Sequence, residues 1–159
     1  MNSEVNYIPL FTPNVPQSAI EAVSRTLNSR WIGQGPQVDE FEELLSKTFC
    51  GGDPGIAVGS GTDALHLAYL LAGIGPGDEV IVPDMTWVAT ANAVKYVGAK
   101  PIFADIEYDK WTLDAGAVER LITNKTKAII PAHLYGHPAN MTQLLKISKK
   151  YNLKIKFII

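Results

Sequence analysis

The residues whose types and spacing best suit a ligand-binding role form a glycine turn, Gly59-Ser60-Gly61-Thr62-Asp63. This turn separates a short apolar segment from an apolar helical pattern. The apolar segment, Ile56-Ala57-Val58, predicts a strand. A strand, turn and helix of this kind present backbone N–H groups and the positive end of a helix dipole, to which Ser60 and Thr62 add hydroxyl donors. The sequence therefore predicts a phosphate-binding site. Thr62 and Asp63 are also good helix N-caps, so a purely structural turn is the alternative.

A large aromatic residue, Trp87, follows the predicted strand 79–83 and begins the next predicted helix. An indole at this position could stack on a flat heteroaromatic ring whose phosphate tail sits at the glycine turn. The alternative is that Trp87 packs against a neighbouring helix. The first interpretation predicts a phosphorylated aromatic cofactor.

Polar and aromatic side chains gather in the loop after the predicted strand 128–131, where His133, Tyr135 and His137 follow one another closely. Two histidines at this spacing raise the question of a metal ion. A glycine and a proline interrupt any common helical face, and no nearby cysteine or carboxylate completes a ligand set. We therefore expect no metal, and favour contacts to a ligand or to a neighbouring subunit, with a structural loop as the remaining alternative.

The elements that must position these residues alternate between helices and strands. Helices are predicted over 16–27, 38–49, 64–72, 87–96, 115–122 and 141–151, and strands over 56–58, 79–83, 101–105, 128–131 and 153–159. Such alternation predicts an α/β fold with a mostly parallel sheet covered by helices on both faces, a three-layer αβα arrangement. Ligands of such sheets bind beyond the carboxyl ends of the strands, where the residues described above would lie.

Composition limits the class of protein and its partners. The chain has 159 residues, 47% of them hydrophobic, which is typical of one globular domain. A net charge of -2 leaves no basic surplus for a nucleic-acid backbone, and the single cysteine excludes an internal disulfide. The first residues lack the pattern of a signal peptide, and no apolar run reaches membrane-spanning length. We expect a cytoplasmic protein that binds neither nucleic acid nor membrane.

A dinucleotide-binding site is the second interpretation of the glycine turn, because Gly59-x-Gly61-x-x-Ala64 fits the permissive form of that fingerprint and Asp84 lies near the position of a ribose-binding acid. Three features oppose it. Asp63 would bring a carboxylate close to a pyrophosphate, two predicted helices precede the first strand, and Trp87 occupies space that an adenosine would need. The prediction of a nucleotide-binding oxidoreductase therefore ranks second.

Taken together, the motifs resemble the N-terminal part of the sugar aminotransferases of the DegT/DnrJ/EryC1/StrS family. The resemblance covers residues 8–138 in family order and spacing. It is carried by Ile8-Pro9-Leu10, Trp31-Ile32-Gly33-Gln34-Gly35-Pro36, residues 59–67, residues 73–83, residues 86–93 and His133-Leu134-Tyr135-Gly136-His137-Pro138.

The resemblance implies a fold type I large domain that binds pyridoxal phosphate (PLP) and transfers an amino group, usually from glutamate, to a keto group of a nucleotide-linked sugar. Residues 1–159 would form a single, incomplete PLP-binding domain, with 1–50 as an N-terminal helical segment. By resemblance, the cofactor contacts would be Ser60, Gly61, Thr62, Asp63 and Trp87, and the substrate side would involve Trp31, His133 and Tyr135.

The subgroup that the chain most resembles is the perosamine synthetases, which aminate GDP-4-keto-6-deoxymannose. This resemblance implies a role in the synthesis of the lipopolysaccharide O-antigen. Members of the family are typically homodimers in which each active site borrows residues from the partner, so a homodimer is the implied assembly.

Two catalytic groups of the family have no counterpart here. The acid that pairs with the pyridinium nitrogen would follow the predicted strand 153–159, and the Schiff-base lysine would lie farther along. The lysines of predicted helices and polar turns are expected to be solvated surface groups; they are Lys47, Lys95, Lys125, Lys146, Lys149 and Lys150. We therefore expect a shortened chain that binds the cofactor weakly and catalyses nothing alone, and an inert interaction protein is the third interpretation.

Overall fold

A computed structural model describes residue 9 and residues 12–155, and the chain divides into two compact units that meet between Ala57 and Val58. The first unit contains α1 (Gln17–Ser29) and α2 (Pro36–Phe49), close to the two helices predicted there. Neither helix buries a residue. Pro36 opens α2 at a position where its missing N–H costs no hydrogen bond.

The predicted strand 56–58 is wrong. These residues pair with no strand of the described chain, and the Ile56 side chain is 66% exposed. The Ala57 N–H instead donates to the Glu42 carboxylate at 2.8 Å. A strand needs a hydrogen-bonded neighbour as well as an apolar sequence. The three apolar residues satisfy only the second condition, because no strand of the described chain lies beside them.

The second unit is built on a parallel sheet, as predicted. It contains β1 (Glu79–Pro83), β2 (Lys100–Ala104), β3 (Thr126–Ile129) and β4 (Lys154–Ile155) in the order β2-β1-β3-β4, and every pair of neighbours is parallel. The predicted boundaries of β1 are reproduced, whereas β2 and β3 begin one or two residues earlier than predicted. The last four residues of the predicted strand 153–159 lie outside the described residues.

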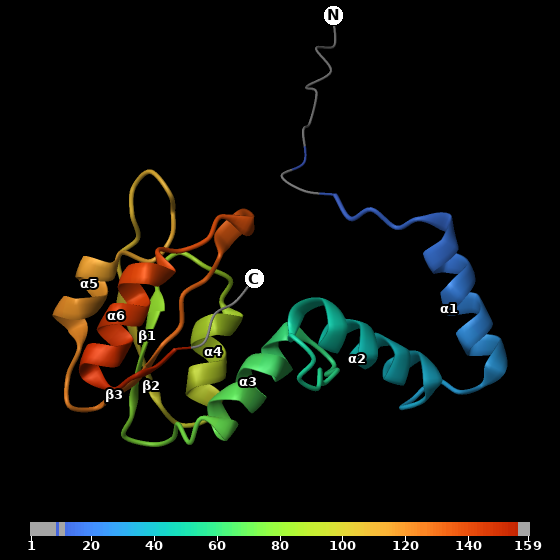
Figure 1. Ribbon diagram of the computed structural model, residues 1–159, viewed down its shortest axis with the longest axis horizontal. Helices are drawn as coiled ribbons and strands as arrows, with labels where there is room; N and C mark the ends of the chain where they lie inside the picture. Colours follow the sequence, from blue (N-terminus) through green and yellow to red (C-terminus); the bar gives the residue numbers. More distant parts are fainter. Residues whose placement is uncertain (1–8, 10–11, 156–159) are drawn as a thin grey trace, which may run out of the picture. The chain divides into compact units, whose positions relative to one another are not determined.

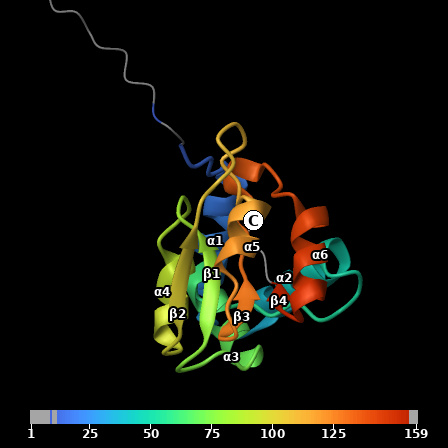
Figure 2. The same ribbon diagram turned by 90° about the vertical axis from the view of Figure 1, so that its left-hand side faces the viewer.

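Helices cover both faces of this sheet, which confirms the three-layer arrangement (Figures 1 and 2). On one face, α3 (Gly61–Leu71) and α4 (Ala89–Tyr96) pack on Val80 and Val82 of β1. On the other face, α5 (Ala115–Leu121) and α6 (Met141–Tyr151) pack on Ile81. The alternation of β1 side chains between two apolar cores explains why its residues 80–83 are continuously apolar.

The order of the strands creates a topological switch point. The chain leaves β1 through α4 and reaches β2 on one side, then returns through α5 to β3 on the other side of β1. The connections after β1 and β3 therefore depart toward opposite faces of the sheet. A crevice between two such connections is where open α/β sheets bind ligands.

Candidate functional site

The glycine turn begins α3 with a reciprocal cap. Ser60 is the N-cap residue: its hydroxyl accepts a hydrogen bond from the Asp63 N–H at 3.2 Å and donates to the Asp63 carboxylate at 2.9 Å. The helix consequently starts at Gly61, earlier than the predicted start at residue 64. The N-cap is Ser60 and not Thr62 or Asp63. The turn does cap a helix, as the structural alternative to a phosphate site predicted, but through a different residue.

The cap leaves two amides of the glycine turn available. Among the described residues, the N–H groups of Gly61 and Thr62 have no hydrogen-bond acceptor. Gly61 is exposed and Thr62 half-buried, and a Cβ on Gly61 would meet no atom within 4 Å. Two open amides at the N-terminus of a helix suit an anionic oxygen. The Asp63 carboxylate accepts its hydrogen bond from the Ser60 hydroxyl.

A cavity of about 190 Å³ opens at the switch point between β1 and β3. Met85, Thr86 and Trp87 line it from the connection after β1, and Leu134 and Tyr135 line it from the connection after β3. We call it the switch-point crevice. Three residues beyond Trp87, in the first turn of α4 (Ala89–Tyr96), the Thr90 carbonyl accepts a hydrogen bond from the Tyr69 hydroxyl at 3.3 Å, which ties the start of α4 to α3.

The indole of Trp87 is 77% exposed and precedes α4, which begins at Ala89. This exposure contradicts the alternative in which Trp87 packs against a neighbouring helix. A large apolar ring left open at a crevice is available to a ligand.

The predicted pair His133 and Tyr135 takes two different roles in the connection after β3. His133 is half-buried, and its Nδ1 accepts a hydrogen bond from the Ala139 N–H at 3.2 Å, which fixes the ring within the loop. Tyr135 is 69% exposed and lies in the short helix η1 (Leu134–Gly136) with φ of 53°. Of the two, only Tyr135 lines the switch-point crevice.

Sequence reasoning missed Trp111. Its indole meets the Tyr135 ring edge to face, with ring centroids 6.4 Å apart and an interplanar angle of 62°. The signal was available, because Trp111 follows β2 at the same edge of the sheet that made Trp87 a candidate. Only the folded structure shows that the connection after β2 reaches the one after β3.

Trp31 lies in the first unit, in the loop between α1 and α2. Its indole N–H donates to the Gln34 carbonyl at 2.5 Å, and the ring lies over Gly35, where a Cβ would collide with it. The glycine is therefore required by the close approach of the indole.

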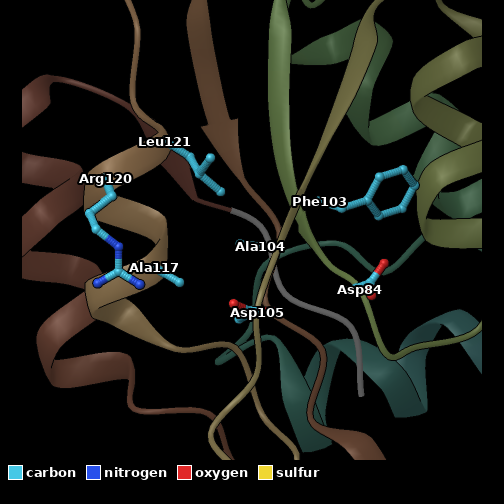
Figure 3. A pocket seen from close by; sticks show the side chains of 7 residues that line it. All are labelled: Asp84, Phe103, Ala104, Asp105, Ala117, Arg120 and Leu121. Carbon is cyan, nitrogen blue, oxygen red and sulfur yellow. The ribbon is translucent and has the colours of Figure 1, made fainter.

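A second cavity, of about 310 Å³, lies at the carboxyl end of β2 (Figure 3). Ala117, Arg120 and Leu121 of α5 line it on one side of the strand, and Asp84 and Phe103 lie on the other side. It contains none of the residues predicted to bind PLP or the sugar, but Asp84 is the ribose-binding candidate of the dinucleotide interpretation.

Residue 9 and residues 12–155 hold no group of three or more histidine, cysteine, aspartate or glutamate side chains placed to bind a metal ion. Within the same residues, every helix is too short or too polar to cross a lipid bilayer.

The parallel sheet, the helices on both of its faces and the crevice at the switch point define a doubly wound α/β protein with a candidate ligand site between two connections. Residues 13–157 match the DegT/DnrJ/EryC1/StrS aminotransferase family, and the chain belongs to that family. The aminotransferases of this family are PLP-dependent. The match favours the aminotransferase interpretation over the dinucleotide-binding one.

Relatives include enzymes that act on nucleotide sugars. The chain is 43% identical to GDP-perosamine synthase of Escherichia coli O157:H7 over 94% of its own length, and 38% identical to UDP-4-amino-4-deoxy-L-arabinose–oxoglutarate aminotransferase of Shewanella sediminis, also over 94%. Among solved structures, NtdA from Bacillus subtilis with bound cofactor PMP superposes with a TM-score of 0.81 at 34% identity, over 96% of this chain and 37% of that one. The chain spans 41% and 38% of the lengths of the two relatives.

Proposed function

We propose that this chain supplies the phosphate-binding turn and the ring-stacking indole of a PLP-dependent sugar aminotransferase. The observation that carries the proposal is the exposed Trp87 at the switch-point crevice, in a chain that belongs to an aminotransferase family. PLP, when bound, acts as an electron sink at the substrate carbon. The residues of this chain bind and orient it.

Each proposed cofactor residue has a stated task. The Gly61 and Thr62 amides, with the hydroxyls of Ser60 and Thr62, would hold the phosphate at the positive end of the α3 dipole. The Asp63 amide, which now donates to Ser60, would join them if the Ser60 hydroxyl turned toward the phosphate. Trp87 would lie against the pyridine ring.

The switch-point crevice has no lysine among its lining residues. Lys47, Lys110 and Lys150 form ion pairs, and Lys154 donates to the Ala72 carbonyl. We therefore propose that this chain alone holds the cofactor without a covalent bond, weakly, and that the Schiff-base lysine and the pyridinium-pairing acid are not among these residues.

The substrate we propose is a nucleotide-linked keto sugar of the perosamine type, with glutamate as the amino donor and His133, Tyr135 and Trp31 on the substrate side. The similarity to GDP-perosamine synthase supports this choice. A role in O-antigen synthesis in the cytoplasm and assembly as a homodimer complete the proposal.

The proposal is tested by the binding of 4′-deoxypyridoxine 5′-phosphate, which has the ring and the phosphate of PLP but no aldehyde that could react with surface lysines. We expect saturable binding to the 159-residue chain by equilibrium dialysis. Thr62→Val and Trp87→Ala should each weaken binding about tenfold, because they remove a donor to a charged group and a stacking surface. Deoxypyridoxine without the phosphate should not bind measurably.

Thr142→Val is the matched control, because Thr142 occupies the same second position of α6 that Thr62 occupies in α3. It should leave binding unchanged. Equal affinities of the Thr62 and Thr142 variants would overturn the phosphate site, and no binding by the unaltered chain would favour the inert interaction protein.

A further inference from the structure

Among the described residues, four that are not glycine adopt a left-handed backbone: Arg30, Trp111, Tyr135 and Asn152. Arg30 and Asn152 directly follow α1 and α6 as C-caps, where a left-handed residue is common. Trp111 and Tyr135 lie instead in turns. The Trp111 N–H closes the hairpin turn that begins at Glu107. Tyr135 is the first central residue of the turn that the His137 N–H closes on the Leu134 carbonyl. A bulky aromatic residue at positive φ is an outlier that its surroundings must enforce.

These two residues touch each other. The Trp111 and Tyr135 rings meet edge to face, although they come from the connections after β2 and after β3. Both views show the two connections side by side above the carboxyl ends of the strands (Figures 1 and 2). Trp111 is 50% exposed, so the contact is made at the surface and not within a core.

The loop that carries Trp111 is held firmly. The Glu107 N–H donates to the Thr112 carbonyl at 2.8 Å, and the Trp111 N–H donates to the Glu107 carbonyl at 2.8 Å. Leu113, which is fully buried, anchors the loop in the core beneath it. The backbone that carries the indole therefore has a fixed position.

The same loop has a second feature that is unfavourable for folding. Among the described side chains, the Thr112 hydroxyl is the buried polar group without a hydrogen-bond partner. An unpaired buried hydroxyl beside a strained backbone is unfavourable for folding. Unfavourable local features of this kind cluster at ligand-binding and active sites.

We propose that Trp111 is a positioning residue that holds the Tyr135 ring at the switch-point crevice, where it stacks on a ring of the nucleotide-linked sugar. This inference rests on the proposed function, because the substrate class comes from there. Tyr135 lines the crevice and Trp111 stands behind it, so Trp111 acts through Tyr135. The shared ligand chemistry is a ring with an apolar face, supplied by the base or by the pyranose.

The test uses GDP-mannose as the probe and measures its affinity for the 159-residue chain together with the melting temperature. Trp111→Phe should bind within about twofold of the unaltered chain, because it keeps an aromatic edge against Tyr135. Trp111→Ala and Trp111→Gly should both bind about tenfold more weakly. Trp111→Gly should nevertheless melt at a higher temperature than Trp111→Ala, since glycine tolerates positive φ.

A merely structural role predicts the opposite pattern, in which affinity follows the melting temperature across the three variants. That pattern would overturn the inference. Tyr108→Ala, which removes a 96% exposed ring from the same loop, and Asn152→Gly, which changes a left-handed cap, are controls that should not alter affinity.

Two further arms separate the possible outcomes. If the affinity for GDP alone falls in the Trp111 variants as the affinity for GDP-mannose does, the stacked ring is the base. If only the affinity for GDP-mannose falls, the stacked ring is the sugar. A chain that binds 4′-deoxypyridoxine 5′-phosphate but not GDP-mannose would overturn the inference and leave the proposed cofactor site intact. Failure to bind either ligand would overturn both.

Discussion

At the scale of single residues, burial controls the ionisation of Tyr69, whose side chain is fully enclosed and whose hydroxyl donates to the Thr90 carbonyl. Burial raises the pKa of this hydroxyl above its ordinary value. Above about pH 10 the unfolded chain releases the proton that the folded chain keeps. Stability is therefore unaffected below that pH and falls as the pH rises beyond it. We expect the melting temperature of Tyr69→Phe to fall less steeply above pH 10.

The matched control is Tyr108→Phe, which alters an exposed hydroxyl and should reproduce the pH profile of the unaltered chain. At neutral pH, Tyr69→Phe should cost about 1 kcal/mol for the lost hydrogen bond. Parallel pH profiles of the Tyr69 variant and the unaltered chain would contradict the prediction.

At the scale of elements, the start of α5 depends on Asp114. Its carboxylate accepts hydrogen bonds from the Gly116 N–H at 2.9 Å and the Ala117 N–H at 3.2 Å. We expect Asp114→Ala to lower the free energy of unfolding by about 1 kcal/mol in urea denaturation, because two amides lose their acceptor. Asp114→Asn keeps an acceptor and should recover most of the loss. An Asp114→Ala variant as stable as Asp114→Asn would show that the cap contributes little.

At the scale of the whole molecule, the two units differ in how their elements are protected. α1 and α2 bury no residue, whereas β1 and β3 lie between two apolar cores. Helices of this length are marginal without packing. We expect hydrogen exchange followed by mass spectrometry to show rapid exchange over 17–29 and 36–49, and the slowest exchange over 79–83 and 126–129.

The protein concentration is the control for this measurement. Protection of α1 that increases with concentration would indicate that a second copy covers its apolar side chains, as the proposed homodimer requires. Protection equal to that of β1 at the lowest usable concentration would contradict the prediction.

Local patterns in the sequence determined the fold class and most of the elements. The continuous apolar run of β1 marks a strand buried on both faces, and the repeat of apolar residues in α6 marks a helix with one buried side, so both elements were predicted with their observed bounds. The family resemblance rests equally on local motifs, and it was confirmed.

The tertiary structure decided the features that sequence patterns did not predict, which are strand pairing, the start of α3 and contacts between residues distant in the sequence. The segment 56–58 is apolar but has no strand beside it, and the Ser60 cap moves the start of α3. The contact of Trp111 with Tyr135 joins the connections that lead from β2 to α5 and from β3 to α6, two helices that pack on the same face of the sheet. The exposure of Trp87 is likewise a property of the folded chain. Residue type and spacing specify which groups could do chemistry, but the tertiary structure specifies which of them meet, because these contacts join residues that are far apart in the sequence.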